Sequence, residues 1–433
     1  MHVSRRNGTF PFVSLLAVAT FSLLLVLNGL AVQAAVPAGE SQENPEWKVG
    51  VASAKVTPDA PLPMAGYAGR KEPAEGTEQD LFAKAILFED STGKRVVFIP
   101  LDLIRVTHEL RTHVAEQVAE KFGIASEALL MNASHTHCGP AYGRDESAEY
   151  FAWLKDRLVQ LVGESLESLE PASLTYSHAK CSVAMNRRTP TATGYRNHPN
   201  PDGLVDHTVP VLAAYRPDGD LRAVVFGYAC HNTTMGFRKW LGDYAGFAQE
   251  YFQADHPGVT ALFMMGCGGD QNPYPRSELK YAQMHGRSLA TSIEAALEEN
   301  QGSPLHRRVV HGPLRSTLQT VDLSFETPNR PDVAYPVQVI RFGNDIMLIA
   351  LGSEVTVDYS LRLKYELTRL EGPEIWVAGY SNVYDGYIPS RRVLLEGGYE
   401  AASRPWKPDL EERIITKVHQ IVGEREGQPA TAK

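Results

Sequence analysis

Residues 96–133 alternate between strand-like and helix-like patterns, and this alternation restricts the fold more than any other feature of the chain. Residues 96–104 and 128–133 are apolar runs of strand length. Between them, residues 108–122 repeat apolar side chains at helical spacing after a capping threonine, Thr107. Such a strand–helix–strand unit predicts two parallel strands joined by a right-handed crossover. The apolar helix positions are Leu110, Val114, Val118 and Phe122.

The same alternation continues through most of the chain, with polar residues gathered where the apolar runs end. The sequence therefore predicts an α/β fold, with a mixed sheet core and helices packed around it. Residues 186–206 are instead irregular and rich in Arg, Pro, Asn, Gly and His, and we expect a binding loop there. Further strands are expected at 48–56, 83–89, 209–215, 223–229, 259–265, 309–323, 337–341, 346–351 and 374–378, and further helices at 147–169, 244–254, 279–299, 355–370 and 410–422.

The amino end has the layout of a signal peptide. Arg5 and Arg6 precede an apolar run over 10–32, and the small residues at 31–35 suit cleavage. We therefore expect export, to the periplasm or out of the cell. An uncleaved membrane anchor is the lesser alternative, because the run is close to spanning length. The expected organisation is a signal peptide at 1–35, a linker at 36–46, one catalytic domain at 47–425 and a disordered tail at 426–433.

Charge and cysteine spacing argue against two classes of function. The formal net charge is −9 without any basic tract, so nucleic acid is not an expected partner. No cysteines form a C-x-x-C pair, which argues against zinc held by thiolates. Because export permits disulfides, the cysteines are expected either as buried thiols or in one or two disulfides of open pairing. They are Cys138, Cys181, Cys230 and Cys267.

Histidines follow the ends of two expected strands. His135 and His137 come after 128–133, at a spacing that keeps both rings on one side of an extended segment. His231 follows 223–229. Because α/β folds bind ligands outside the carboxyl ends of their strands, these imidazoles suit a metal, or a metal ligand paired with an acid/base. A pair of hydrogen-bonded loop histidines explains the same pattern equally well.

Three other features are ambiguous when each is taken alone. Residues 62–69 are Gly-rich and apolar, as in a loop packed along a site. Glu354 follows the strand expected at 346–351, where a helix dipole would also explain a carboxylate. Tyr387 alone is most simply a packed aromatic residue. A metal site at the carboxyl ends of the strands is favoured only when these features and the histidines are taken together with their order along the chain, which matches that of a known family, as described next.

Taken together, these stretches resemble the amino-terminal catalytic domain of the neutral/alkaline non-lysosomal ceramidases, which are zinc-dependent amidases. The resemblance implies a hydrolase of linear amides, with lipid N-acyl amides as the substrate class. It extends from about residue 48 to about residue 400, in the order of the family's motifs. The matching stretches are 50–69, Ser134-His-Thr-His-Cys-Gly-Pro140, Asn186-Arg187, Cys230-His231-Asn-Thr-Thr, Gly269-Asp270, Ser353-Glu354, Tyr384-Asp-Gly-Tyr387 and Tyr399-Glu400.

The resemblance also assigns roles to individual residues. It implies one Zn²⁺ per chain, with a zinc-activated water as the nucleophile. Carried onto this sequence, the zinc ligands are His135, His231, Glu354 and Tyr387. His137 would then handle the proton, while Arg187 and Tyr399 would steady the developing oxyanion.

Two departures from the family bear on the substrate. Asn272 stands where the family carries a serine, so a serine nucleophile is excluded there and Asn272 is expected to donate a hydrogen bond instead. The family's carboxyl-terminal β-sandwich domain is not expected in this chain. The alternatives are a zinc hydrolase of another amide or an ester, and a non-catalytic member that binds a lipid or glycan. A small-molecule or lipid N-acyl substrate is the expected partner, and a lipid substrate is compatible with peripheral membrane contact.

Overall fold

The computed structural model describes residues 46–298, 308–369 and 372–424. The expected signal peptide and tail, and all but the last residue of the expected linker, lie outside these residues. The compact unit that holds the described residues is Asn44–Lys433. Among the described helices, none combines the length and the hydropathy needed to cross a membrane.

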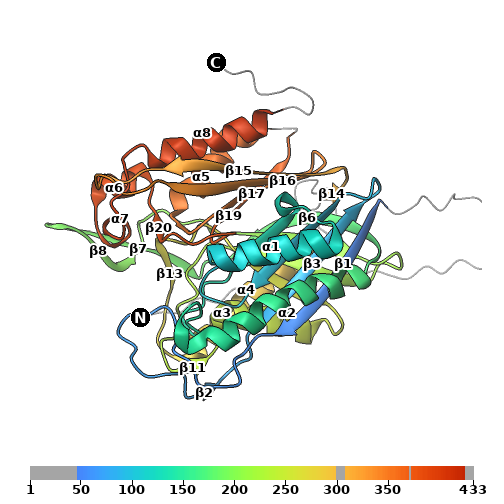
Figure 1. The fold of residues 1–433 in the computed structure, drawn as a ribbon, viewed down its shortest axis with the longest axis horizontal. Helices are drawn as coiled ribbons and strands as arrows, with labels where there is room; N and C mark the ends of the chain where they lie inside the picture. Colours follow the sequence, from blue (N-terminus) through green and yellow to red (C-terminus); the bar gives the residue numbers. More distant parts are fainter. Residues whose placement is uncertain (1–45, 299–307, 370–371, 425–433) are drawn as a thin grey trace, which may run out of the picture. The chain divides into compact units, whose positions relative to one another are not determined.

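Four layers build this unit, in the order helices, sheet, sheet, helices (Figure 1). The larger sheet has nine strands in the order β12-β10-β9-β6-β1-β3-β4-β5, with β14 beside β6. It is mixed, as predicted, because β4–β5 and β10–β12 are parallel whereas the other pairs are antiparallel. Its strands are β1 (Trp47–Lys55), β3 (Phe82–Asp90), β4 (Arg95–Leu101), β5 (Leu129–Ala133), β6 (Glu170–Lys180), β9 (Thr208–Tyr215), β10 (Leu221–Tyr228), β12 (Thr260–Met265) and β14 (Arg308–Val310).

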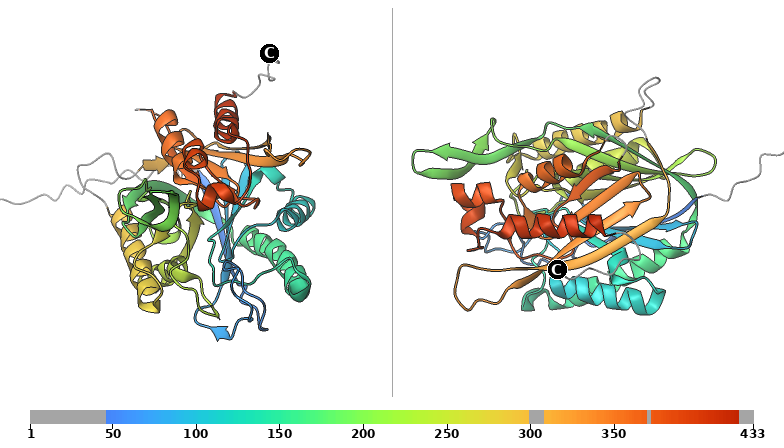
Figure 2. Two further views of the ribbon diagram at one scale, coloured as in Figure 1. Left: turned by 90° about the vertical axis from the view of Figure 1, so that its left-hand side faces the viewer. Right: turned by 90° about the horizontal axis from the view of Figure 1, so that it is seen from above.

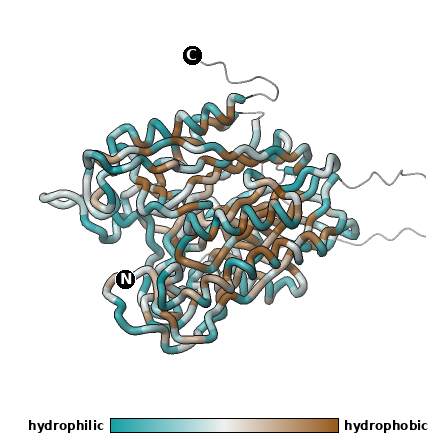
Figure 3. The backbone as a smooth tube through the Cα atoms, in the orientation of Figure 1, coloured by the Kyte–Doolittle hydropathy of each residue, from teal (hydrophilic) through white to brown (hydrophobic). Residues whose placement is uncertain are grey.

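Two pairs of helices cover the outer face of the large sheet. Helices α1 (His108–Phe122) and α2 (Ala148–Glu167) pack over the half that holds β1, β3, β4 and β5. Helices α3 (Asp243–Asp255) and α4 (Leu279–Leu297) pack over the half that holds β6, β9, β10 and β12. The left-hand view of Figure 2 shows one pair on each side of the blue segment. Figure 3 shows the hydrophobic positions concentrated in the strands and on the helix sides that face them, as burial of apolar area requires.

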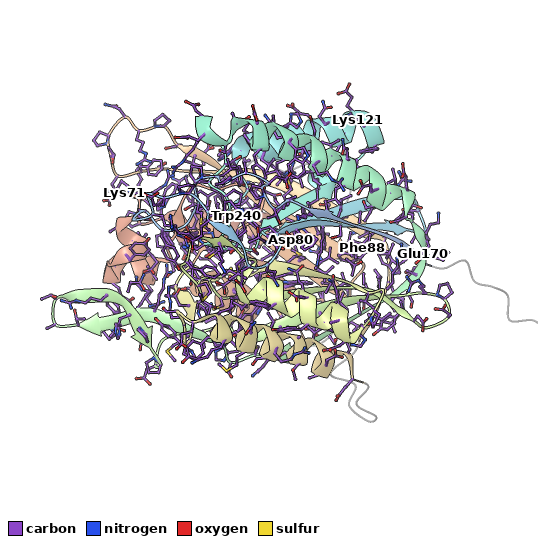
Figure 4. The ribbon with its side chains drawn as sticks, turned by 90° about the horizontal axis from the view of Figure 1, so that it is seen from below. Lys71, Asp80, Phe88, Lys121, Glu170 and Trp240 are labelled. Atoms are coloured by element: carbon purple, nitrogen blue, oxygen red, sulfur yellow. The ribbon has the colours of Figure 1, made fainter. Side chains whose placement is uncertain are left out.

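The inner face of the large sheet packs on a second, four-stranded sheet, in the order β15-β16-β17-β19. The ring of Phe342 lies 5.7 Å from Trp47, 5.2 Å from Phe88 and 6.2 Å from Phe98, between ring centroids. Helices α5 (Val357–Leu367) and α8 (Leu410–Gly423) cover the outer face of this sheet. Figure 4 shows the buried Phe88 among packed side chains and the exposed Lys121 at the periphery. The strands are β15 (Leu314–Leu323), β16 (Val333–Phe342), β17 (Ile346–Leu351) and β19 (Glu374–Ala378).

The strand–helix–strand unit forms as predicted. Strands β4 and β5 are parallel neighbours joined through α1, whose bounds agree with the expected 108–122. The Thr107 hydroxyl accepts a hydrogen bond from the backbone nitrogen of Leu110 at 3.1 Å, which satisfies a free donor of the first turn. Gly123 ends the helix with φ 66°, a conformation that costs glycine little. The bounds were predictable because apolar spacing, cap and stop signal all agree.

Two expectations about single segments were wrong, and one strand was missed. The segment 186–206 is largely a hairpin of β7 (Ala184–Thr191) and β8 (Gly194–Asn200), paired with β13 (Gln271–Pro273). These residues are mostly polar and are ordered by backbone hydrogen bonds between the strands. Because the strands have no alternation of apolar and polar residues, the sequence did not reveal them. Strand β6 was not predicted. The run 309–323 was expected as one strand but is divided between β14 and β15 at Gly312-Pro313, because proline has no backbone N–H to donate to a neighbouring strand.

All four cysteines are free and buried, which favours the buried-thiol alternative. Burial also raises the pKa of the Cys138 thiol to about 12, so this side chain stays protonated and is a poor nucleophile at neutral pH.

Candidate active site

His135 lies immediately beyond the end of β5 and is held by two backbone contacts. Its backbone nitrogen donates to Leu103 O at 3.0 Å, and its Nδ1 lies 2.6 Å from Ile104 O. Because only a protonated nitrogen donates to a carbonyl, a neutral ring has its Nε2 lone pair free. The residue has φ 60°, and Ser353, beside Glu354, has φ 67°. Such strained backbone persists only where its surroundings hold it, commonly at functional sites.

His231 is arranged in the same way at the end of β10. Its Nδ1 lies 2.7 Å from Gly268 O, which again leaves the Nε2 lone pair free. A carboxylate faces both rings, since Glu354 Oε2 lies 3.1 Å from His231 Nε2 and 3.2 Å from His135 Nε2. All three side chains are buried. Three acceptor atoms thus face one another, and this arrangement is repulsive unless a proton or a metal cation lies among them.

His137 completes the cluster. Its Nε2 lies 3.2 Å from His135 Nε2, and ring nitrogens of His135, His137 and His231 all lie within 4.8 Å of one another. The predicted loop along the site is present: a Cβ on Gly66 would lie 2.4 Å from His137 Cγ, so the loop backbone contacts the ring. Burial lowers the pKa of His137 well below its usual value and, with the nearby Arg187 charge, lowers that of His231 to about 4. Both rings are therefore neutral at physiological pH.

A short strand pair brings Tyr387 to the cluster. β18 (Glu354–Val355) and β20 (Tyr387–Ile388) pair in parallel, with Glu354 opposite Tyr387. The Tyr387 hydroxyl lies 3.4 Å from His231 Nε2. It also accepts a hydrogen bond from Arg187 Nη2 at 2.8 Å. The four residues that the resemblance assigned to zinc thus lie together, although they come from three distant parts of the sequence.

Arg187 lies on β7, at the base of the hairpin, and its buried guanidinium links several residues. Nε donates to Glu400 Oε1 at 2.9 Å, Nη1 to Asn272 Oδ1 at 3.3 Å and Nη2 to Gly269 O at 2.7 Å. Since the Asn272 oxygen accepts from Arg187, the amide NH₂ is left as the donor of that side chain. Tyr399 lies at the edge, 55% exposed, with its ring 5.4 Å from that of Tyr387.

Two residues of the site were not singled out from the sequence. Tyr384 donates from its hydroxyl to Glu354 Oε1 at 2.7 Å, and Glu400 pairs with both Arg187 and Arg188. Both residues lie in the sequence motifs that match the family, so treating every polar residue of those motifs as a candidate would have identified them. Asp270 and Asp243 instead accept backbone hydrogen bonds, from Val357 and Met235 respectively, so each holds a turn beside the cluster.

Comparisons with known proteins agree on the fold. Neutral ceramidase from Pseudomonas aeruginosa superposes with a TM-score of 0.74 at 18% identity, over 90% of this chain and 76% of that one. Neutral ceramidase B of Dictyostelium discoideum is 27% identical over 55% of this chain and 37% of its own length, and neutral ceramidase 1 of Arabidopsis thaliana is 25% identical over 60% and 36%. The matched region therefore spans about a third of the length of these curated relatives.

Half of the chain, residues 47–264, matches the family described as neutral/alkaline non-lysosomal ceramidase, N-terminal. This stretch carries the His135 and His231 segments, and the structural likeness extends over the remaining layers. The chain therefore belongs to the neutral/alkaline non-lysosomal ceramidase family.

Proposed function

We propose that this protein is an exported, zinc-dependent hydrolase of a linear N-acyl amide. Membership of a hydrolase family supports the reaction class, and the signal-like amino end supports export. One observation carries the proposal: the Nε2 atoms of His135 and His231 both lie within 3.2 Å of Glu354 Oε2. The Nδ1 atom of each ring already contacts a backbone carbonyl, so each Nε2 lone pair is free to bind a metal. That donor set fits zinc, which takes neutral imidazole and carboxylate ligands held in orientation by outer hydrogen bonds.

In this proposal His135, His231, Glu354 and Tyr387 hold one zinc ion. When bound there, zinc polarises the amide carbonyl and lowers the pKa of the attacking water. His137 accepts the proton of that water and delivers it to the leaving amine nitrogen. Arg187 and Tyr399 stabilise the developing oxyanion, and Glu400 holds Arg187 in place. The Asn272 amide donates a hydrogen bond to the substrate or to the water.

The proposal is tested by metal analysis together with a panel of acyl amides. Protein purified without added metal should contain about one zinc per chain, as expected for a four-ligand catalytic site. A chelator should remove the metal and the amidase activity together, and added zinc should restore both. Hydrolysis of N-acyl amides but not of matched esters would select the amidase over the esterase alternative. Metal-free protein that takes up no zinc on dialysis would contradict the proposal.

Replacing Asn272 with alanine tests how much its side chain contributes, and the mass of the protein during turnover tests whether a protein nucleophile is needed. If water attacks directly, Asn272→Ala loses one donor, and kcat should fall on the order of 10²-fold without reaching zero. Asn197→Ala, at an exposed position of β8, is the control and should retain full activity. Intact mass measured on protein quenched during turnover should show no acyl adduct. A trapped acyl-enzyme would mean that another side chain is the nucleophile.

A further inference from the structure

Two arginines lie next to the histidine cluster and form no ion pair within the described residues. They lie around Tyr67, whose ring packs edge-on against His137 with 4.7 Å between ring centroids. The Arg70 guanidinium lies over the Tyr67 ring at 4.8 Å, and Arg276 Nη2 lies 3.4 Å from the Tyr67 hydroxyl. Arg276 is four residues beyond Asn272, so β13 and the loop after it contribute to both parts of the site.

The hydrogen bonds of Arg70 do not neutralise its charge. It donates to the backbone carbonyl oxygens of Ala65, His137 and Phe237, and its Nε is buried without a hydrogen-bond partner among the described residues. The next residue, Lys71, is exposed and adds a further positive charge to the same loop (Figure 4).

Two carboxylates bear on these arginines: Asp243, which acts on Tyr67 as they do, and Glu278, two positions after Arg276. Asp243 accepts hydrogen bonds from the backbone nitrogens of Met235 and Tyr244, at 2.9 Å and 2.7 Å. Glu278 pairs with Lys280 at 2.7 Å. Asp243 therefore sets one negative charge against the two guanidinium charges, and the corner beside His137 keeps a net positive charge although the whole chain is acidic. Positive charge gathered beside a site attracts an anion and raises its local concentration.

We propose that the substrate carries an anionic group beside its scissile amide, and that Arg276, Arg70 and Tyr67 form the subsite that receives this group. The inference rests on the hydrolase function proposed above. It narrows the substrate class to acyl amides that carry a carboxylate or phosphate group next to the amide bond. Arg276 supplies the accessible donors, because its only hydrogen bond among the described residues is the long contact to Tyr67. A charge-assisted hydrogen bond at this position would favour an anionic over a neutral substrate by about 10- to 100-fold in KM.

The test compares probes that share one acyl chain and differ in charge. N-lauroylglycine presents a carboxylate, N-lauroylethanolamine phosphate presents a phosphate, and N-lauroylethanolamine is neutral. We expect KM for the preferred anion to lie about 10- to 100-fold below that of the neutral amide, and Arg276→Gln to remove the difference while leaving the neutral amide unchanged. Whichever anionic probe has the lower KM shows whether the subsite prefers a carboxylate or a phosphate.

Two control variants mark the subsite. Arg287→Gln on α4, where Asp255 already pairs with the arginine, should keep the preference. Arg105 lies over the ring of Tyr384 at 5.2 Å, and the Tyr384 hydroxyl bonds to Glu354. Arg105→Gln should also keep the preference for the anionic substrate. Loss of the preference in Arg105→Gln instead of Arg276→Gln would overturn the assignment of the subsite.

Calorimetry of binding separates this inference from the proposed reaction. The intact protein should bind N-lauroylglycine or the phosphate more tightly than N-lauroylethanolamine whether or not it hydrolyses them. Hydrolysis of neutral and anionic amides with equal KM would overturn the subsite and leave the hydrolase standing. Absence of all hydrolysis, with a clear preference for an anion in binding, would remove the hydrolase and support the subsite. Equal affinities for all three probes would overturn the subsite.

Discussion

Replacing His135 or His231 with alanine is expected to remove zinc and hydrolytic activity together. Each ring offers an Nε2 lone pair toward Glu354 Oε2, at 3.2 Å and 3.1 Å, and its Nδ1 is fixed by a carbonyl. Loss of either imidazole leaves one nitrogen ligand beside two oxygen ligands, a set that binds zinc less tightly and should lose it to a chelator. Zinc per chain should fall from about one to near zero, measured by elemental analysis beside the amidase rate.

The matched control is His419→Ala, because His419 is an exposed histidine on α8 that pairs with Glu366 at 2.6 Å. This variant should keep both zinc and activity. The melting temperature of the His135 and His231 variants should not exceed that of the wild-type protein after zinc removal, since each variant loses the metal and also the buried Nδ1 contact with a carbonyl. A His135→Ala protein that retains stoichiometric zinc would refute the ligand set, even if its activity were lost.

Replacing His137 with alanine is expected to separate zinc binding from catalysis. In the proposed mechanism His137 moves the proton and does not hold the metal. His137→Ala should therefore keep about one zinc per chain and lower kcat by about 10²- to 10⁴-fold, the usual contribution of a general base. KM should change little, because the substrate contacts assigned to Arg187, Tyr399 and Asn272 remain. Steady-state kinetics with elemental analysis of the same preparation measures both quantities.

The structure makes this second experiment decisive, because the ring nitrogens of His135, His137 and His231 lie within 4.8 Å of one another and would suit a three-histidine ligand set as well. Loss of zinc from His137→Ala would assign the third imidazole to the metal and would require another base. Full activity with zinc retained would exclude His137 from proton transfer. The contact with Gly66 limits the substitutions that are informative, since a larger side chain at position 137 would collide with that loop.

Local signals in the sequence determined several parts of this protein. The helix at 108–122 was predictable because Thr107, the apolar spacing and Gly123 act within a few residues of one another. The parallel pairing of β4 and β5 followed from the handedness of a strand–helix–strand unit. The eight candidate residues were found from motifs, and each motif is short and continuous in the chain.

Other features depended on contacts between distant segments. The hairpin of β7 and β8 has no apolar alternation to reveal it, because backbone pairing and the Arg188–Glu400 ion pair order it from outside. Strand β6 likewise has a polar sequence for much of its length and is ordered by β9 and β1. Side-chain periodicity reports burial, so strands ordered mainly by backbone hydrogen bonds escape it.

The geometry of the site was decided by the tertiary structure alone. The sequence placed His231 and Glu354 after strands but gave no distance between them, and they are 123 residues apart. Only the stacking of two sheets brings the ends of β5, β10 and β17 to one place, with the Nδ1 atoms facing carbonyls and the Nε2 atoms facing Glu354. The positive corner around Tyr67 arises in the same way, since Arg70 and Arg276 are 206 positions apart and meet only in the folded chain. Local sequence encodes which side chains are available, whereas long-range packing determines which of them meet.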